Sequence, residues 1–260
     1  MNSLTAAFLG AIQGLTEFLP VSSSGHLALA NSILKIPSDN LFFEVVLHLG
    51  TLFAVMLFMR KKIISLIKGM IREISDKSEN PKKNLRYGGY IIAGIIPAVV
   101  FALIFDELIE KTFSDMRFVG IFFLITAVML FATKFFNKSK KIEFKSALFI
   151  GIAQIIALFP GISRSGTTIS SGIMLGIDRE DACDFSFFMA MPLILGAFLK
   201  ELLDTKPLFD FAILIGFLSA FVFGYFSVLF LYRVLKSNKF HYFSYYLAAL
   251  GIFTIARSLL

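Results

Sequence analysis

Six apolar stretches, each about as long as a helix that crosses a lipid bilayer, constrain this chain more than any other feature of its sequence. A spanning helix needs about 20 mostly apolar residues. Only 17% of the residues are charged, against about 25% in an ordinary soluble domain. We therefore expect an all-α polytopic membrane protein with six transmembrane helices, over residues 41–59, 88–105, 117–136, 183–203, 207–232 and 241–260.

Two further apolar stretches, residues 4–19 and 145–159, are too short to cross a bilayer comfortably. Each ends at a break that is rich in Pro, Gly and Ser, and a second short apolar segment follows each break. This short–break–short pattern is typical of a re-entrant helical hairpin. We therefore predict two such hairpins, over residues 4–36 and 145–177.

The two hairpins resemble each other when the sequence is shifted by 141 residues. Each is followed by three spans, so an odd number of crossings would invert the second half relative to the first. We predict one membrane domain, 1–260, that consists of two inverted-topology repeats, 1–140 and 141–260, whose breaks face each other near the bilayer midplane. The alternative is chance similarity between two Ser- and Gly-rich loops. The matches are Gly10 with Gly151, Gln13 with Gln154, Phe18 with Phe159, Ser22 with Ser163, Ser24 with Ser165 and Gly25 with Gly166.

Basic residues concentrate on alternate connections between the spans. The predicted loop 60–86 holds nine basic and three acidic residues, and the connector 134–145 holds five Lys and one Glu. The positive-inside rule makes this side cytoplasmic and places both termini outside. The acidic run 178–181 lies on the same side, but acidic residues weigh little in the rule. The net charge of +7 therefore indicates membrane topology, and we expect no nucleic-acid partner.

The first break carries a carboxylate within an apolar segment. Gln13 and Glu17 are four residues apart, so a helix presents both on one face. A buried charge costs at least a few kcal/mol (~2.5–3.5 on insertion scales), so Glu17 requires a cation, a metal ion or a proton. The residues Ser22 to Gly25 lie where the second short helix begins, and its free N–H groups favour an anion. His26 follows in the first turn.

The second break supplies the missing cation. The planar fork of Arg164 suits two oxygens of a phosphate group. If the two halves pack as predicted, both breaks converge on a site that suits pyrophosphate. Simpler interpretations remain open for several of these residues. Ser22, Ser23 and Ser24 could be helix caps, and Glu17 with Arg164 could be a structural pair. His26 could be a structural histidine, and His48 could be structural or a partner of the site. The break reads Pro160-Gly161-Ile162-Ser163-Arg164-Ser165-Gly166-Thr167-Thr168.

The two breaks closely resemble the bacterial undecaprenyl pyrophosphate phosphatase family, also called BacA or UppP. The first family motif is (E/Q)xxxE, a PxSS-type turn and GH, and the second is PGxSRSxxT. The resemblance extends along the chain and implies six spans, two re-entrant hairpins, inverted repeats and a site open to the outer face. The matching residues are Gln13, Glu17, Pro20, Ser22, Ser23, Gly25 and His26, then Pro160, Gly161, Ser163, Arg164, Ser165 and Thr168.

The resemblance implies hydrolysis of a C55 polyprenyl pyrophosphate to its monophosphate, which recycles a lipid carrier for cell-wall synthesis. It implies the plasma (inner) membrane of a bacterial cell, and a homodimer is left open. We favour Ser23 as nucleophile over water, with His26 as general base or acid. Glu17 would bind Mg²⁺ or Ca²⁺ or accept a proton. The expected catalytic residues are Glu17, Ser23, His26 and Arg164, and the expected substrate-binding residues are Gln13, Ser22, Ser24, Gly25, Ser163, Ser165, Gly166 and Thr168.

Two other classes of function fit the same features. Inverted repeats with broken helices at midplane are typical of secondary transporters, so a lipid-phosphate flippase or a phosphate transporter is the main alternative. A membrane scaffold that binds the lipid without turnover is the second. Release of phosphate by protein in detergent, where no gradient exists, separates hydrolysis from both.

Overall fold

The computed structural model describes residues 2–36, 41–75, 82–113, 115–136, 138–204 and 210–259. These residues form helices, short connections and one isolated bridge between Lys140 and Ile177. The helices are α1 (Ser3–Glu17), α2 (Ser23–Leu34), α3 (Leu41–Ser75), α4 (Lys83–Ile104), α5 (Asp106–Phe113), α6 (Met116–Ala132), η1 (Thr133–Phe135), α7 (Phe144–Gln154), η2 (Ile155–Leu158), α8 (Arg164–Met174), α9 (Arg179–Asp204), α10 (Phe211–Lys236), η3 (Phe240–Tyr242) and α11 (Phe243–Ser258).

Five helices within the described residues are long and apolar enough to cross a membrane: α3, α4, α6 with η1, α9 and α10. The expected all-helical architecture with several spans is therefore confirmed. The sixth predicted span, 241–260, corresponds to α11, which has only 16 residues. Because this is shorter than the ~20 residues of a typical span, the count of six stays a prediction.

The predicted loop 60–86 is wrong, because most of it is helical. Helix α3 has 35 residues and continues to Ser75, and α4 begins at Lys83; residues 76–81 lie outside the described ranges. The charges mark where the chain leaves the membrane, but Lys, Arg, Ile and Met are adequate helix formers in water. The carboxylate of Glu73 then accepts hydrogen bonds from the backbone N–H groups of Asn84 and Leu85, which caps α4. The short helix α5 was also not predicted.

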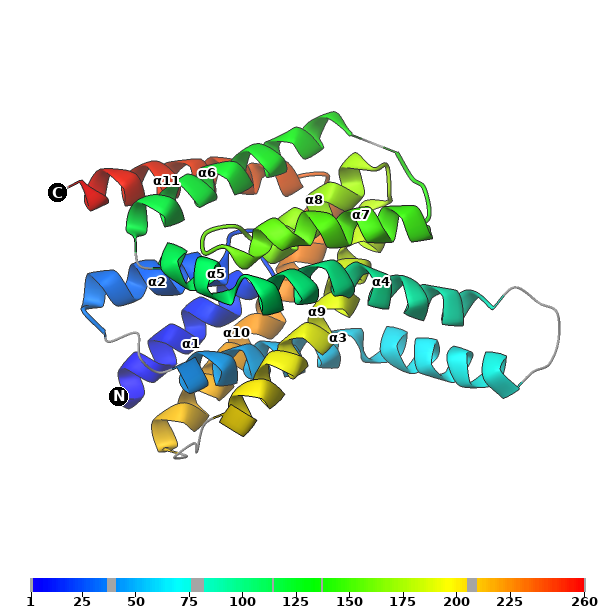
Figure 1. Ribbon diagram of the computed structural model, residues 1–260, viewed down its shortest axis with the longest axis horizontal. Helices are drawn as coiled ribbons and strands as arrows, with labels where there is room; N and C mark the ends of the chain where they lie inside the picture. The colour runs from blue at the N-terminus through cyan, green and yellow to red at the C-terminus, as the bar shows by residue number, and fades with distance from the viewer. Residues whose placement is uncertain are drawn as a thin grey trace.

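The two broken helices enter the molecule from opposite ends. Figure 1 shows α1 and α2 at the end where the chain begins and α7 and α8 toward the other end, with both breaks near the middle. Helix α1 packs most extensively on α10, and α7 packs on α4. The first helix of each hairpin therefore rests on a span from the other half. The predicted repeats 1–140 and 141–260 stay a prediction.

Glycines permit both of these crossings. A Cβ atom added to Gly10 would lie 2.4 Å from the carbonyl oxygen of Gly216 on α10. A Cβ atom added to Gly151 would lie 2.5 Å from the carbonyl oxygen of Gly94 on α4. Gly10 and Gly151 are equivalent under the shift of 141 residues, so the sequence match corresponds to the same type of close helix contact in each half.

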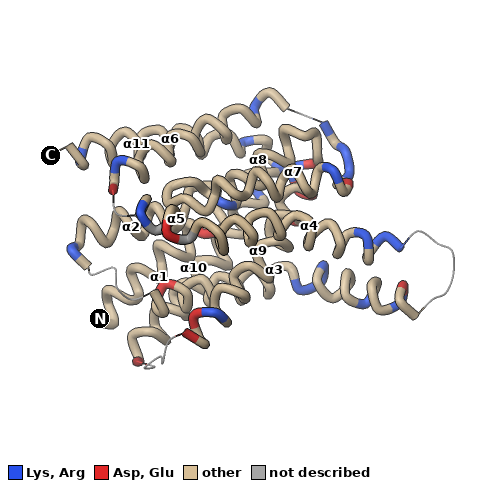
Figure 2. Tube along the Cα trace, viewed as in Figure 1, with Lys and Arg blue, Asp and Glu red and all other residues tan. Residues whose placement is uncertain are grey.

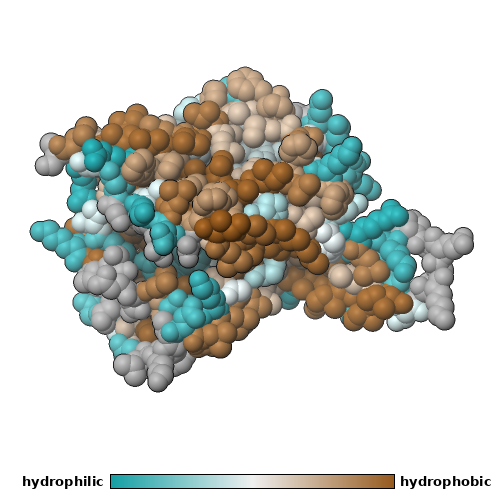
Figure 3. Space-filling view, in the orientation of Figure 1, coloured by the Kyte–Doolittle hydropathy of each residue, from teal (hydrophilic) through white to brown (hydrophobic). Residues whose placement is uncertain are grey.

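Charge and hydropathy divide the surface along the long axis. Figure 2 shows Lys and Arg gathered at the end where α3 ends and α4 begins, and along the chain leading into α7. Figure 3 shows an apolar band across the middle of the visible face, with hydrophilic groups toward the two ends. This distribution matches a helical bundle whose long axis crosses the membrane.

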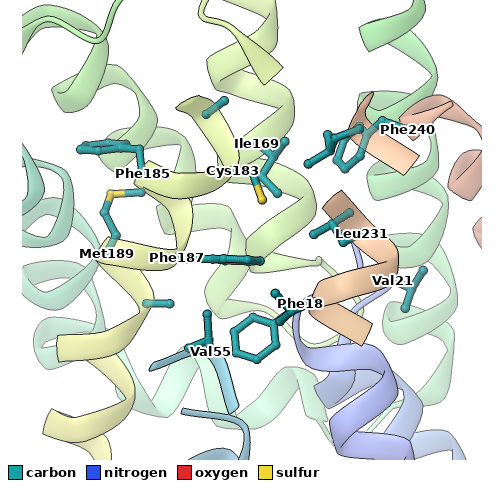
Figure 4. Close-up of a cluster of buried hydrophobic side chains, with 14 of the residues drawn as sticks. Phe18, Val21, Val55, Ile169, Cys183, Phe185, Phe187, Met189, Leu231 and Phe240 are labelled. Atoms are coloured by element: carbon teal, nitrogen blue, oxygen red, sulfur yellow. The ribbon is translucent and has the colours of Figure 1, made fainter. Parts of the chain in front are cut away.

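A buried apolar cluster fixes the first break against the second half of the chain. Phe18, directly after α1, is fully buried, and its ring centroid lies 4.9 Å from that of Phe187 on α9 in an edge-to-face arrangement. Figure 4 shows the two rings adjacent, with Val55 and Leu231 nearby. Because α9 follows the second hairpin, this packing links the tip of the first hairpin to the other half.

Candidate active site

The two breaks lie directly against each other in the middle of the molecule. A Cβ atom added to Gly25 would lie 2.9 Å from the Cα atom of Gly161 and 2.6 Å from the ring of Phe123. The hydroxyl of Ser165 donates a hydrogen bond to the carbonyl oxygen of Leu19 at 3.0 Å. The approach leaves no space for a side chain at position 25, which explains the glycine there.

Both short inner helices begin with the same serine cap. The hydroxyl oxygen of Ser22 accepts a hydrogen bond from the backbone N–H of Gly25 at 3.3 Å, and that of Ser163 accepts one from Gly166 at 3.0 Å. The interpretation of Ser22 as an N-cap is therefore correct, and Ser163 caps the second inner helix in the same way. The equivalent hydroxyl pairs are also formed, Ser22 with Ser24 at 3.3 Å and Ser163 with Ser165 at 3.2 Å.

The first break holds a serine in an unfavourable backbone conformation. Ser22 has φ of 66°, in the left-handed region that favours glycine, whereas the second break has a glycine in that region, Gly161 with φ of 99°. A non-glycine residue there costs roughly 1–3 kcal/mol and persists where surrounding contacts over-determine it. The strained turn directs the next residue, Ser23, toward Glu17.

Glu17 joins the two halves of the site. Its Oε1 accepts a hydrogen bond from Nη2 of Arg164 at 2.6 Å. Its Oε2 accepts one from the hydroxyl of Ser23 at 2.6 Å and one from Nε2 of Gln13 at 3.0 Å. The Glu17 side chain is 7% exposed and that of Arg164 17% exposed, so this is a largely buried ion pair. It brings together one charge from each break.

Two polar atoms of this cluster are buried without a hydrogen-bond partner among the described residues: Oε1 of Gln13 and Nη1 of Arg164. Buried polar groups in native proteins almost always have a partner, so water, an ion or a ligand is expected to supply one here. The guanidinium N–H groups require an acceptor such as a phosphate oxygen. The amide oxygen requires a donor or a cation.

A small cavity opens beside this cluster. Its volume is about 220 Å³, below the ~300–1,000 Å³ typical of pockets for drug-sized ligands. It has room for a phosphate-containing head group, while a long hydrocarbon chain would have to lie outside it. The lining residues are Glu17, Ser22, Ser23, Ser24, His48, Ala157, Leu158, Ile162, Ser163 and Arg164.

His26 lies beside the cavity but does not line it. Its Nδ1 is 2.8 Å from the carbonyl oxygen of Ser22, so this nitrogen carries a proton and donates it. Its Nε2 is 2.7 Å from the hydroxyl of Tyr246, and the ring packs edge-to-face on Phe123. Both ring nitrogens are therefore engaged with protein groups. The role of His26 as general base or acid stays a prediction.

Other predicted binding residues also bond to protein groups. The hydroxyl of Thr168 donates to the carbonyl oxygen of Arg164 at 2.8 Å and lies 2.6 Å from the hydroxyl of Ser186. Gly25 and Gly166 contribute backbone N–H groups to the serine caps. These residues, with Ser165, shape the two breaks, and their direct contact with substrate stays a prediction.

The structure adds His48, which the sequence interpretation treated as structural or as a partner of the site. Its Nδ1 lies 2.8 Å from the carbonyl oxygen of Glu44, so Nδ1 is a donor. The opposite nitrogen, Nε2, lines the cavity and lies 3.5 Å from Oε2 of Glu17. An ionisable residue within an apolar span is a candidate functional residue by default, and this signal was available in the sequence.

The expected divalent cation has few protein ligands available in this site. Among the described residues, no group of three or more His, Cys, Asp or Glu side chains is arranged to hold a metal ion. The Glu17 carboxylate and the unpartnered Oε1 of Gln13 are oxygen donors of the kind that Mg²⁺ and Ca²⁺ prefer. Phosphate oxygens of a substrate would complete the coordination, as is usual for Mg²⁺.

Comparisons with known proteins show which family the chain belongs to. The family model described as "Bacitracin resistance protein BacA" matches residues 6–253. The chain is 41% identical to a protein named undecaprenyl-diphosphatase from Methanosphaera stadtmanae, over 99% of each chain. It is 37% identical to one of the same name from Methanobrevibacter smithii, over 100% of this chain and 99% of the relative. A third, from Christiangramia forsetii, is 39% identical over 98% of each.

Proposed function

Because the chain belongs to the BacA family, as its two breaks indicated, we propose that it hydrolyses undecaprenyl pyrophosphate to undecaprenyl phosphate and inorganic phosphate. Relatives named for this activity match it over nearly its whole length. The observation that carries the proposal is the meeting of Glu17, Ser23 and Arg164 beside a cavity of head-group size. The product would return the lipid carrier to cell-wall synthesis.

Ser23 is the proposed nucleophile. Its Oγ would attack the terminal phosphorus, the bond from that phosphorus to the bridging oxygen would break, and the lipid monophosphate would leave. Glu17 would accept the serine proton across the present 2.6 Å hydrogen bond, and water would then hydrolyse the phosphoserine. Nη1 of Arg164, together with the N–H groups of both short helices, would stabilise charge on the transferred group.

The two histidines would act differently. His26 would hold the strained turn through the Ser22 carbonyl oxygen, and its bond to Tyr246 would have to open before the ring could act on substrate. His48 presents Nε2 to the cavity and to Glu17 in the present arrangement. We therefore add His48 to the proposed site, and we assign His26 the role of positioning Ser23 instead of the general base or acid expected from the sequence.

A divalent cation, Mg²⁺ or Ca²⁺, would bind to Glu17, Gln13 and the substrate phosphates. When bound, it would neutralise phosphate charge and polarise the terminal phosphoryl group.

The proposed membrane arrangement has six spans and two re-entrant hairpins, with the active site facing the outer side of the cell membrane. Three observations support it. The two hairpins enter the molecule from opposite ends, α1 and α7 each pack on a span of the other half, and basic residues gather at one end of the molecule. The hydrocarbon chain of the substrate would lie along the helices in lipid. A homodimer is a separate proposal, which the mass of the purified protein–detergent complex would test.

Phosphate release in detergent tests the proposed activity. The wild-type protein should release phosphate from undecaprenyl pyrophosphate in the presence of Mg²⁺ or Ca²⁺. Arg164→Ala should lower kcat by about 10²-fold or more, as expected for removal of a donor to a developing anion. Arg117→Ala is the matched control, because this arginine is exposed and pairs only with Asp115 beside it among the described residues. Binding of the lipid without turnover would instead support a flippase, a transporter or a lipid-binding scaffold.

A further inference from the structure

A larger cavity lies at the basic end of the molecule and shares no residue with the proposed active site. Its volume is about 690 Å³. It lies between the α3–α4 hairpin on one side and α9 with the connector before α7 on the other. The lining residues are Lys61, Lys62, Ser65, Leu66, Lys83, Asn84, Arg86, Tyr87, Tyr90, Lys141, Ile142, Asp181, Asp184 and Phe188.

The charges of this cavity are unbalanced. Five lining residues are basic and two are acidic. Lys62 forms an ion pair with Asp184, which also accepts a hydrogen bond from Tyr232. Asp181 lies within the electrostatic reach of Lys62 and Lys141. The side chains of the remaining cations, Lys61, Lys83 and Arg86, form no hydrogen bond or ion pair with any part of the chain that the structure describes.

The walls of the cavity are held in place by specific contacts. The carboxylate of Glu73 ties α3 to the start of α4, with hydrogen bonds from the Asn84 side chain at 2.6 Å and the Leu85 N–H at 2.9 Å. On the other side, the backbone N–H of Lys140 donates to the carbonyl oxygen of Gly176 at 2.8 Å, which fixes the connector that carries Lys141. The cavity is therefore a built feature and not a gap between loose segments.

Part of the cavity wall is aromatic and apolar, formed by Leu66, Tyr87, Tyr90, Ile142 and Phe188. The ring of Tyr87 packs against Phe185 at 5.9 Å and Phe188 at 5.7 Å, both on α9. Helix α4 also faces the lipid: only 11% of its apolar window is buried, against 33–50% in the other candidate spans. A ligand with a negative head and a hydrocarbon tail could thus place the head among the cations and the tail along α4.

We propose that this cavity binds the phosphate head group of an anionic phospholipid from the adjacent leaflet. Unpaired cations between helices at the membrane surface bind lipid phosphate, whereas inorganic phosphate would leave the aromatic surface unused. The site is separate from hydrolysis, since it shares no residue with the cavity beside Glu17. It would regulate or stabilise the protein through the α3–α4 hairpin.

Native mass spectrometry of the detergent-solubilised protein tests this site. Phosphatidylglycerol should bind saturably at one site, with at least ten-fold higher affinity than zwitterionic phosphatidylcholine. The triple variant Lys61→Gln/Lys83→Gln/Arg86→Gln should lose at least ten-fold in affinity for phosphatidylglycerol. The control Lys68→Gln/Arg72→Gln/Lys145→Gln removes the same charge from exposed residues outside the cavity and should bind as the wild type does.

Three results would overturn the proposal. Equal losses in the two triple variants would mean diffuse attraction by the basic end, and equal binding of phosphatidylcholine would remove the selectivity for anionic lipid. If millimolar inorganic phosphate displaced bound phosphatidylglycerol as effectively as free phosphatidylglycerol does, the cavity would be a site for free anions.

Thermal unfolding of both triple variants checks that they fold. If the triple variant does not fold, the lipid-induced shift of Tm in each single variant replaces the affinity measurement. Arg164→Ala should bind phosphatidylglycerol normally, so failure of the phosphatase proposal would leave this result interpretable.

Discussion

Glu17 is the residue on which both breaks depend. Three groups, from Arg164, Ser23 and Gln13, donate hydrogen bonds to one carboxylate that is almost entirely buried. Removing one partner of a buried ion pair commonly costs about 3–5 kcal/mol, since the other charge is left uncompensated. The pair therefore maintains the fold around the cavity as well as the charge that the proposed chemistry requires.

At the same scale, His48 should matter through its ring, whose Nε2 lies 3.5 Å from Oε2 of Glu17. Because Nδ1 donates to the Glu44 carbonyl oxygen, the ring pairs with Glu17 when both of its nitrogens carry a proton. Loss of a charge-assisted contact costs about 1.5–3 kcal/mol, which corresponds to roughly 10–100-fold in rate. His48→Ala should therefore lower kcat at least ten-fold in the phosphate-release assay. His48→Gln should retain most of the activity, because its amide can still donate to the carboxylate. Wild-type turnover in His48→Ala would remove this residue from the site.

The pairing of Glu17 with Arg164 could be predicted from the sequence, because two charges in apolar segments each need a partner. The approach of His48 to this pair could not. It depends on how α3 lies against α1, which residue spacing does not encode. The contact between the hydroxyls of Thr168 and Ser186 also depends on tertiary packing, and so do the contacts of both His26 ring nitrogens with protein groups. Neither could be predicted from the sequence.

At the scale of elements, the main structural feature is that the first helix of each hairpin packs on a span from the other half. Helix α1 contacts α10 through Gly10, and α7 contacts α4 through Gly151. Small residues at such crossings allow backbones to approach closely, which is how helices associate in lipid. Each hairpin is thereby held by the opposite half, and the breaks are kept together.

These crossings should not tolerate a methyl group. Gly10→Ala and Gly151→Ala should each destabilise the protein by about 1–3 kcal/mol, as expected for overpacking against a backbone carbonyl. Gly196→Ala on α9 is the matched control, since a Cβ atom there meets nothing within 4 Å. Thermal unfolding in detergent should show lower Tm for the first two variants and an unchanged or higher Tm for the control. A lowered Tm in all three would show that the crossings are not special.

The positions of the helical breaks were predictable, because Pro20 and Pro160 with their neighbouring serines interrupt otherwise apolar segments. The end of α3 was not. Hydropathy reports where a helix leaves the membrane, and α3 continues to Ser75 because its charged residues still form a helix and Glu73 caps α4. The short helix α5 was missed for the same reason.

At the scale of the whole molecule, the charge asymmetry sets the expected orientation. The basic end carries the α3–α4 connection and the second cavity, and the chain begins and ends at the other end (Figures 1 and 2). The positive-inside rule places the basic end in the cytoplasm. The proposed lipid site would then lie in the inner leaflet.

Cysteine labelling tests this orientation. Cys183, the chain's only cysteine, is fully buried and can be replaced to give a silent background. In that background, Leu259→Cys should react with a membrane-impermeant maleimide on intact cells. Ser75→Cys, at the exposed end of α3, should react only after permeabilisation. The reverse pattern would invert the topology.

The central claim is that the two breaks form one catalytic site, and a double-mutant cycle on phosphate release measures this most directly. Ser23 comes from the first break and Arg164 from the second. If they act on one phosphoryl transfer, Ser23→Ala and Arg164→Ala should each reduce kcat/KM severely, and the double variant should be little slower than the slower single variant. A shared site would be contradicted if the two reductions in kcat/KM multiplied in the double variant, or if either single variant kept wild-type turnover.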